Sequence, residues 1–284
     1  MKTTPAPCKA RCGNFVLRNE NKRGGDGDVP AFFRLSPWSP FTPRKSHVFR
    51  GVKGDEEEEN LGQSIERFIM KRDEDTNGRG LFLVLDGVDG AGKTTQLDLL
   101  EEWLLAQSHS VVRLRDPGGT SLGEKVRSIL LDPASHMAMN AETLLYLASR
   151  AQLVAESIQP ALDRDVTVLS DRYELSTIVY QGLAGGVDPD AIRHACELAR
   201  GNCIPDWTGI LDLDPVAAAS RSSRERDRIE QRGMAYHQRV REGFQQEALR
   251  DPDRASLIDA SRSVVDVHRT IRTEVERVLA RRRS

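Results

Sequence analysis

The sequence predicts an α/β fold with a parallel sheet, and three observations support this prediction. From Gly80 onward, short apolar runs alternate with longer amphipathic stretches, which is typical of βαβ units. The first apolar run stops in a glycine-rich turn that leads into a helical pattern. Charged residues follow the later apolar runs, at the carboxyl edge of the predicted sheet. These features indicate a five-stranded parallel sheet with helices on both faces.

Five short apolar runs have the length and composition of strands. We predict strands at Leu81–Leu85, Val111–Arg115, Val166–Ser170, Thr208–Leu213 and Ala255–Asp259. Amphipathic stretches predict helices at Lys93–Gln107, Leu122–Leu131, Ala141–Leu162, Asp188–Arg200, Gln231–Leu249 and Val264–Arg281. The second helix is expected to begin with a capping box formed by Ser121 and Glu124. In the last helix, valine and isoleucine recur at steps of three and four residues, which indicates a face that packs on the core.

A phosphate-binding loop is predicted directly after the first strand. Gly87, Gly92, Lys93 and Thr94 fit the pattern G-x-x-x-x-G-K-[ST]. The strand before it and the helix after it favour this interpretation over an ordinary glycine turn. Lys93 would reach the β- and γ-phosphates of ATP, and the Thr94 hydroxyl would ligate the accompanying Mg²⁺. We expect ATP to be bound by Gly87, Val88, Asp89, Gly90, Ala91, Gly92, Lys93 and Thr94.

Two further motifs follow predicted strands, where ligands bind in open α/β folds. Asp116-Pro-Gly-Gly-Thr120 has two glycines that let backbone approach a ligand, although a plain turn is the alternative. Asp171-Arg172-Tyr173 follows the third strand. Asp171 is expected to hold Mg²⁺ and Arg172 to clamp a second phosphate, the alternative being a structural Asp–Arg pair. The phosphate loop on a neighbouring strand favours the functional interpretation.

An arginine-rich run lies near residue 225. Arg221-Ser-Ser-Arg-Glu-Arg-Asp-Arg228 has four arginines within eight residues and few apolar anchors. One interpretation is a solvated, charged helix face. The other is a lid that brings guanidinium groups onto a transferring phosphoryl group and excludes water.

Residues 1–75 differ in composition from the rest of the chain. They are rich in Pro, Gly, Lys and Arg, show no sustained apolar period, and include the acidic run Asp55–Glu59. Such a segment has little to fold around. The alternatives are a disordered extension, a targeting peptide, and a start codon assigned too far upstream, with the true start at Met70. We therefore expect an N-terminal extension at 1–75 and one folded domain at 76–284.

Composition excludes several classes of function. The chain has 38% hydrophobic and 30% charged residues, which is ordinary for a soluble globular protein. Its formal charge of -2 argues against a dedicated nucleic-acid binder, and no apolar run is long enough to cross a membrane. The four cysteines form no C-x-x-C or zinc-binding pattern, which favours a reducing, cytoplasmic location.

Taken in order, the motifs resemble those of bacterial thymidylate kinases. The resemblance rests on Gly87–Thr95, Asp116–Lys125, Arg150–Gln152, Asp171–Tyr173, Tyr180–Gly182, Pro205-Asp206 and Asp227–Gln231. It extends from about Gly80 to the C-terminus and does not cover the first 75 or so residues. It implies the P-loop nucleoside-monophosphate-kinase fold, a homodimer, and the reaction of ATP with dTMP to give ADP and dTDP.

The resemblance also implies roles for residues that bind dTMP. Asp89 would meet the 3′-hydroxyl side, Arg172 would hold the phosphate, and Tyr180 would crowd the 2′ position of the sugar. At the base, the residues are Tyr146 against the thymine ring, Arg150 one helical turn later, and Thr177 at the base edge.

Six residues are expected to take part in catalysis, from the motifs above and, for Asp89, from the resemblance. They are Lys93, Asp89, Asp171, Arg221, Arg224 and Arg226. Two departures from the family pattern matter. Asp116 replaces the glutamate that is more usual before Pro-Gly-Gly-Thr, and the arginines of the predicted lid, at about 221–231, are spaced differently. The sequence therefore does not assign the catalytic lid arginine.

Two other functions compete with a dTMP kinase. The first is another P-loop nucleotide or nucleoside kinase that differs in its acceptor. The second is a P-loop ATPase that uses hydrolysis to change partners. The second predicts turnover without any nucleotide acceptor, and it leaves Arg150 and Tyr180 without a purpose.

Overall fold

A computed structural model of the chain describes residues 79–221 and 227–283. The predicted extension at 1–75 lies outside the described residues, as do Arg224 and Arg226 of the arginine-rich run. The boundary between extension and domain therefore stays a prediction. Among the helices that the structure describes, none has the length and apolar character needed to cross a bilayer.

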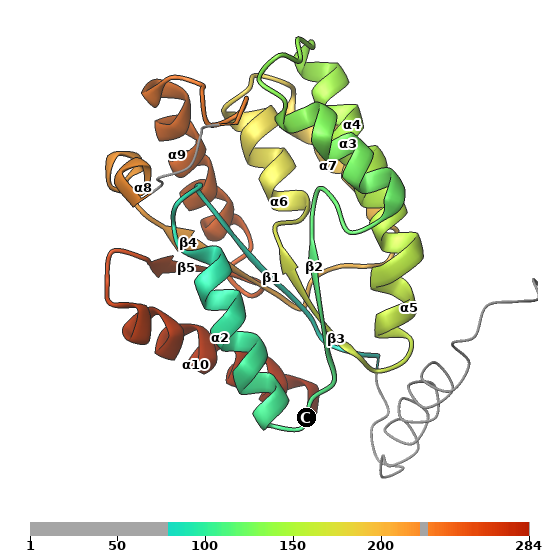
Figure 1. Ribbon diagram of the computed structural model, residues 1–284. Helices are drawn as coiled ribbons and strands as arrows, with labels where there is room; N and C mark the ends of the chain where they lie inside the picture. The colour runs from blue at the N-terminus through green and yellow to red at the C-terminus, as the bar shows by residue number, and fades with distance from the viewer. Residues whose placement is uncertain (1–78, 222–226, 284) are drawn as a thin grey trace, which may run out of the picture. The chain divides into compact units, whose positions relative to one another are not determined.

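Five parallel strands form one sheet, as predicted (Figure 1). The strands are β1 (Phe82–Gly87), β2 (Val111–Arg115), β3 (Thr167–Asp171), β4 (Trp207–Asp212) and β5 (Ala255–Asp259). Their order across the sheet is β2-β3-β1-β4-β5, which puts β1 at the centre. Because all strands run the same way, the segments that follow β1, β2, β3 and β5 meet at one edge of the sheet.

The described helices match the predicted ones to within about three residues at each end, the largest difference being the helix predicted from Gln231, which begins at Met234. Three short elements are added. The helices are α2 (Lys93–Ala106), α3 (Ser121–Leu131), α4 (Met139–Leu153), α5 (Gln159–Leu162), α6 (Glu174–Thr177), α7 (Pro189–Arg200), α8 (Pro215–Arg221), α9 (Met234–Arg250) and α10 (Val264–Arg283), with π-helical turns η1 (Val154–Ile158) and η2 (Ile178–Leu183). The sequence did not predict α6, η2 or α8. Each has fewer than eight residues, too few for a helical period to show.

The helix predicted at Ala141–Leu162 is observed as three consecutive pieces, α4, η1 and α5. Pro160 explains the break. A proline inside an α-helix has no N–H to donate, and its ring clashes with the carbonyl four residues earlier. The wider turn of η1 ends at Ile158, two residues before the proline, and it includes Glu156, whose carbonyl the proline ring would otherwise approach.

The predicted capping box at the start of α3 is wrong by one residue. Thr120, not Ser121, caps the helix, since its Oγ1 accepts from the Gly123 N–H at 2.9 Å. Glu124 reaches outside the helix and accepts from the Gly119 N–H at 2.8 Å. The helix therefore begins one residue earlier than the sequence pattern indicated.

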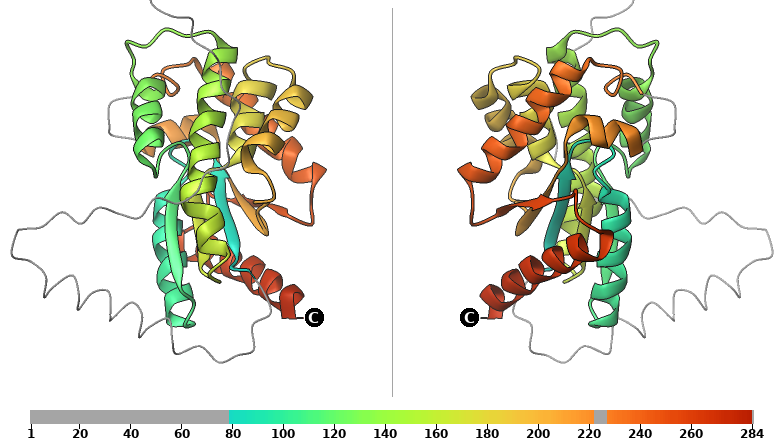
Figure 2. Two further views of the ribbon diagram at one scale, coloured as in Figure 1. Left: turned by 90° about the vertical axis from the view of Figure 1, so that its right-hand side faces the viewer. Right: turned by 90° about the vertical axis from the view of Figure 1, so that its left-hand side faces the viewer.

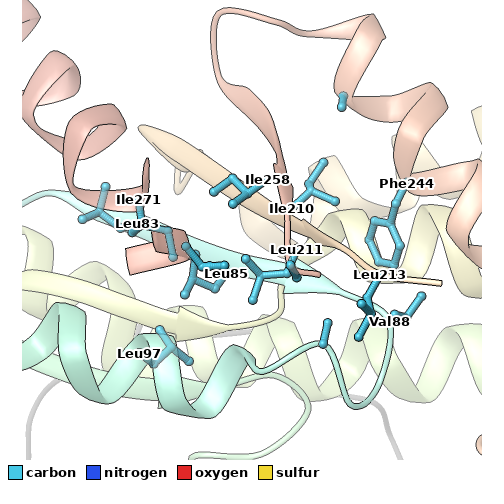
Figure 3. Close-up of a cluster of buried hydrophobic side chains, with 14 of the residues drawn as sticks. Leu83, Leu85, Val88, Leu97, Ile210, Leu211, Leu213, Phe244, Ile258 and Ile271 are labelled. Carbon is cyan, nitrogen blue, oxygen red and sulfur yellow. The ribbon is translucent and has the colours of Figure 1, made fainter. Parts of the chain in front are cut away.

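Helices pack on both faces of the sheet, and alternate residues of β1 contact each layer. Leu85 joins a cluster with Leu97 of α2 and Ile271 of α10, two helices that lie side by side (Figures 1, 2 and 3). Val84 joins a second cluster with Leu162 of α5 on the opposite face. Strand β1 is thus buried on both faces, which fixes the loop that follows it.

Candidate active site

The loop from Gly87 to Lys93 joins β1 to α2 and has the backbone that the glycine pattern predicts. Gly87, Gly90 and Gly92 have φ angles of 126°, 81° and 94°, which favour glycine. A Cβ on Gly87 or on Gly90 would lie 2.4 Å from a backbone oxygen of a neighbouring segment. Within the described chain, no side chain caps the N-terminus of α2. The backbone N–H groups of this helix end are thus suited to bind an anion.

Lys93 is held inside this loop. Its Nζ donates to the carbonyl oxygens of Gly87 at 3.1 Å and Val88 at 2.9 Å, and it lies 4.0 Å from the Asp89 carboxylate. The side chain is only 7% exposed. Burial, together with the positive charge of Arg172, lowers the pKa of Lys93. These contacts fix the ammonium group beside the cavity that the loop lines.

A cavity of 770 Å³ opens over the loop. It is lined by Asp89–Gln96, Arg115, Asp116, Arg127, Asp171, Arg172, Arg221, Glu230, Ala260, Arg262, Val264 and Val267. Arginines predominate among the charged residues outside the loop, which suits a polyphosphate. Ala260, Arg262 and Val264 extend the cavity along the segment between β5 and α10. Its size is that of a site for a small molecule as large as a nucleotide.

Thr94 and Asp171 fit the magnesium site predicted for them. Both line the 770 Å³ cavity, and Thr94 is exposed to it. One carboxylate oxygen of Asp171, Oδ1, is buried with no hydrogen-bond partner among the described residues. The part of the chain that the structure describes has no group of three or more His, Cys, Asp or Glu side chains placed to hold a metal. A hydroxyl and a carboxylate oxygen suit Mg²⁺, which binds through one or two protein oxygens and takes its other ligands from phosphates and water.

Arg172 connects the end of β3 to the phosphate loop. Its Nη1 donates to Asp86 Oδ1 at 3.1 Å, to the Gly87 carbonyl at 2.8 Å and to Ser176 Oγ at 3.1 Å. Its Nη2 donates to Asp89 Oδ1. The residue adopts φ 68°, a left-handed backbone that is uncommon for arginine. Burial favours protonation of Asp89, but the charges of Arg172 and Lys93 outweigh it and lower the pKa of the Asp89 carboxyl.

Asp86 belongs to this cluster, and sequence reasoning missed it. Its Oδ1 accepts from Ser176 Oγ at 2.6 Å and from the Gly87 N–H at 2.9 Å, in addition to Arg172. Burial raises the pKa of Asp86, although the charge of Arg172 opposes that shift. The sequence did contain a signal for Asp86, since this carboxylate directly follows the apolar run Leu81–Leu85. A charge buried at the end of a strand requires partners, which predicts a polar cluster there.

A second, smaller cavity of 80 Å³ adjoins the first. All six residues predicted to bind the acceptor line it, namely Asp89, Tyr146, Arg150, Arg172, Thr177 and Tyr180. Sequence reasoning missed the other lining residues, Asp116, Pro117, Arg127, Leu131, Ser176, Gln181, Asp227 and Ile229. Some of these stood within motifs already noted, as Gln181 does in Tyr180–Gly182, but no local pattern indicated which side chains would face the cavity.

Arg150 is almost fully committed to protein partners. Its Nε donates to Asp116 Oδ2 at 2.6 Å, its Nη2 to Thr177 Oγ1 at 2.8 Å and to the Tyr173 carbonyl at 3.1 Å, and its Nη1 to Cys196 Sγ at 3.5 Å. The side chain is 1% exposed. A guanidinium has five N–H groups. The contacts among the described residues use four of them and leave one N–H on Nη1. At most one donor of Arg150 is therefore left for a molecule in the small cavity, which the residue lines.

The two cavities meet along a shared wall. Asp89, Asp116, Arg127 and Arg172 line both of them. Tyr180 lies on the small-cavity side of this wall, where its hydroxyl donates to Asp89 Oδ2 at 3.2 Å. Groups bound in the two cavities would approach each other at Asp89, Arg127 and Arg172.

Of the three predicted lid arginines, the structure describes Arg221. It ends α8, lines the large cavity, and donates from Nη1 to the Ala260 carbonyl at 3.3 Å. Arg224 and Arg226 lie outside the described residues. The assignment of a catalytic lid arginine stays a prediction.

Comparisons with known proteins converge on one family. The family model described as thymidylate kinase matches residues 85–271, a span that includes every residue lining the two cavities. The chain is 46% identical over 204 residues to the thymidylate kinase of Symbiobacterium thermophilum, covering 71% of this chain and 95% of the relative. It is 46% identical over 186 residues to the thymidylate kinase of Deinococcus radiodurans, covering 65% of this chain and 90% of the relative.

A solved structure has the same architecture. The crystal structure of thymidylate kinase from Ehrlichia chaffeensis is similar with a TM-score of 0.58 and 32% sequence identity. The similarity covers 70% of this chain and 99% of that chain.

The buried pair of Arg150 and Asp116 provides a test of stability. Arg150→Met keeps the length of the side chain but leaves the Asp116 carboxylate buried without its counter-charge. We expect the free energy of unfolding to fall by about 3–5 kcal/mol, the usual cost of breaking one side of a buried pair. Urea denaturation measures this loss. The matched double variant Arg150→Met/Asp116→Asn removes the unpaired charge and should recover part of the lost free energy of unfolding. Unchanged stability in Arg150→Met would contradict the assigned pair.

Proposed function

We propose that this chain, which belongs to the thymidylate kinase family, transfers the terminal phosphoryl group of ATP to dTMP and so makes dTDP. One observation carries the proposal beyond family membership. The phosphate-loop cavity adjoins a second cavity that has its own polar and aromatic lining, and the two share Asp89, Asp116, Arg127 and Arg172. A kinase needs two such sites in contact, whereas a hydrolase needs one.

ATP occupies the larger cavity in this proposal. The N–H groups of the loop and of the first turn of α2 bind its phosphates, and Lys93 supplies a positive charge beside them. Thr94 and Asp171 would hold Mg²⁺, and the ion would supply positive charge beside the phosphates of ATP. Arg262 and Val264 line the same cavity, and we assign them to the nucleoside of ATP.

The phosphate of dTMP lies at the shared wall, next to Arg127 and Arg172. A monophosphate is mostly dianionic at neutral pH, so its oxygen attacks without a general base. A bond forms between that oxygen and the γ-phosphorus, and the bond to the β–γ bridging oxygen breaks, which releases ADP. The task of the protein is therefore positioning and charge stabilisation. Lys93, Arg127 and Arg172 supply the positive charge.

Asp89 is assigned to substrate binding and not to general-base catalysis. Its lowered pKa keeps it a carboxylate, so it only accepts hydrogen bonds. We assign it to the 3′-hydroxyl of dTMP, as the resemblance implies. Its fixed orientation between Arg172 and Tyr180 supports this assignment.

The base of dTMP is assigned to the far end of the small cavity. Tyr146 packs against the ring, and Thr177 lies at the base edge beside Arg150. The one remaining Arg150 N–H donates to the pyrimidine O4. Cytosine has an amino group there that cannot accept this bond, so the same contact disfavours dCMP.

Homodimerisation is the further part of the proposal. α4 packs against both α3 and α7, and each of the three helices has a large apolar side chain that is exposed. Among the described residues these include Ile129 on α3, Leu144 on α4 and Leu198 on α7, the last two 64% and 89% exposed. Exposed apolar residues on adjoining helices are typical of a subunit interface.

The acceptor decides between the proposed function and its competitors. Coupled ADP release should be fastest with dTMP, and dTMP should be preferred over dUMP by about 10–200-fold, because a pocket gains only that much from one methyl group. The panel also includes UMP, CMP, GMP and AMP. Lys93→Ala is the control, and we expect it to lower kcat by about a hundredfold or more. Comparable ADP release without any acceptor would instead indicate an ATPase.

Tyr180 provides a test of sugar selection. If its ring fills the space of a 2′-hydroxyl, Tyr180→Ala should raise kcat/KM for UMP relative to dUMP by about tenfold or more. Tyr180→Phe is the matched control, since it removes only the hydroxyl that donates to Asp89. It should leave the ratio of the two acceptors near that of the wild type. An unchanged ratio in Tyr180→Ala would mean that another group reads the sugar.

The proposed dimer can be tested on its apolar face. Light scattering on the wild-type chain should give twice the mass of the monomer, and Leu144→Arg should shift the mass toward one chain because a buried unpaired charge opposes association. Leu249→Arg is the control, since Leu249 is 83% exposed but lies on α9, outside the proposed face. A monomeric wild-type chain, or equal effects of the two variants, would refute this interface.

A further inference from the structure

Glu142 is a buried carboxylate that lines neither cavity. It lies on α4, one turn before Tyr146 and two turns before Arg150, and it is 1% exposed. We propose that Glu142 is a positioning residue for the acceptor site, a role that rests on the proposed function. It fixes the turn Asp227–Gly233 and the side chain of Gln181 against α4, and these groups form one wall of the acceptor cavity.

The contacts of the carboxylate come from two distant segments. Oε2 accepts from Arg232 Nη2 at 2.6 Å and lies 2.7 Å from Arg228 Nη2. Oε1 accepts from Gln181 Nε2 at 2.8 Å. Both guanidinium groups are largely buried, with 13% and 19% exposure for Arg228 and Arg232. Arg232 and Gln181 donate hydrogen bonds, whereas Arg228 Nη2 makes an ion pair without hydrogen-bond geometry. Both kinds of contact stabilise a buried carboxylate, and each buried guanidinium depends on it in turn.

The turn Asp227–Gly233 reaches both cavities. Asp227 and Ile229 line the acceptor cavity, and Glu230 lines the ATP cavity. The turn is internally rigid, because Asp227 Oδ1 accepts from the N–H groups of Ile229 and Glu230, both at 2.9 Å, while Glu230 Oε2 accepts from the Asp227 N–H at 3.2 Å. A rigid turn moves as a unit, so its anchors decide where Asp227 and Ile229 lie.

Arg228 also ties this turn to the end of α3. Its Nε donates to the Leu130 carbonyl at 2.8 Å, and its N–H donates to the Leu131 carbonyl at 3.2 Å. Leu131 lines the acceptor cavity as well. The guanidinium of Arg228 is thus fixed between α3 and Glu142, and it sets the spacing of the cavity wall.

Arg232 extends the connection to the sugar end of the cavity. Its Nη1 donates to the Tyr236 hydroxyl at 2.7 Å, which donates in turn to the Tyr180 carbonyl at 2.7 Å. Tyr180 is the residue whose hydroxyl contacts Asp89. Glu142 is therefore joined through two side chains to the backbone of the residue assigned to sugar selection.

Gln181 is oriented by the same carboxylate. Because a carboxylate only accepts hydrogen bonds, the amide nitrogen of Gln181 must face Glu142. The amide oxygen consequently points away from Glu142. Gln181 lines the acceptor cavity, so loss of Glu142 would let the amide turn over and change the group that it presents.

Glu142→Gln tests this role through the split between kinetic constants. We expect KM for dTMP to rise by about tenfold or more, with less than about a threefold change in KM for ATP and in kcat, because the affected wall contacts the acceptor in the ground state. The second variant, Arg232→Gln, should give the same pattern. KM for dTMP in the double variant should be no higher than in the single variant with the higher KM, since both changes break the same contact between Glu142 and Arg232. If Glu142→Gln fails to fold, KM for dTMP in Arg232→Gln tests the positioning role instead.

Glu247→Gln is the matched control. Glu247 is 4% exposed and accepts two hydrogen bonds from Arg193, at 2.6 and 2.8 Å, but it lines neither the ATP cavity nor the acceptor cavity. It should lower Tm as Glu142→Gln does and leave KM for dTMP unchanged. Equal KM values for dTMP in the two variants and the wild type would overturn the role of Glu142. A wild-type chain inactive with dTMP would instead refute the proposed function, which the same assay detects first.

Discussion

The guanidinium of Arg172 joins two strands of the sheet to the phosphate loop, and the rest of the site depends on this contact. It bonds to Asp86 at the end of β1 and to Asp89 in the loop, which is possible because β1 and β3 are neighbours. With Lys93, the cluster has two positive and two negative charges. The carboxylates partly offset the positive charge that Lys93 and Arg172 offer to a polyphosphate. Arg127 and the other arginines that line the large cavity add to that charge.

Most of the sheet was predictable because each strand can be recognised from a short, continuous stretch of sequence. Each strand is an apolar run of strand length bounded by polar residues, and the long helices show a clear period. The short elements α6, α8 and η2 carry no such signal. The interruption of the helix before Pro160 had a visible cause in the sequence, but the π-helical form of that interruption depends on how the neighbouring turns pack.

The site was predictable where its residues belong to one contiguous motif. The loop glycines and Lys93 are fixed by local backbone requirements, and the spacing of Tyr146 and Arg150 places both on the face toward the acceptor cavity. Contacts between distant segments leave no local trace. Glu142 and Arg232 are separated by 90 positions, and neither belongs to a pattern that would indicate the other. The sequence also contained no sign that Arg150 has almost no free N–H group, since its four partners come from three separate segments.

The strand order has a consequence for how the chain folds. β1 and β2 are synthesised first, yet they are not neighbours, and each pairs with β3. No pair of strands can therefore form until β3 has been made, and β1 remains open on its other edge until β4 follows. This topology gives a high contact order, which slows folding. Until β3 has been made, the backbone N–H and C=O groups along both edges of the apolar β1 have no strand partner, and unpaired apolar strands of this kind are prone to aggregate.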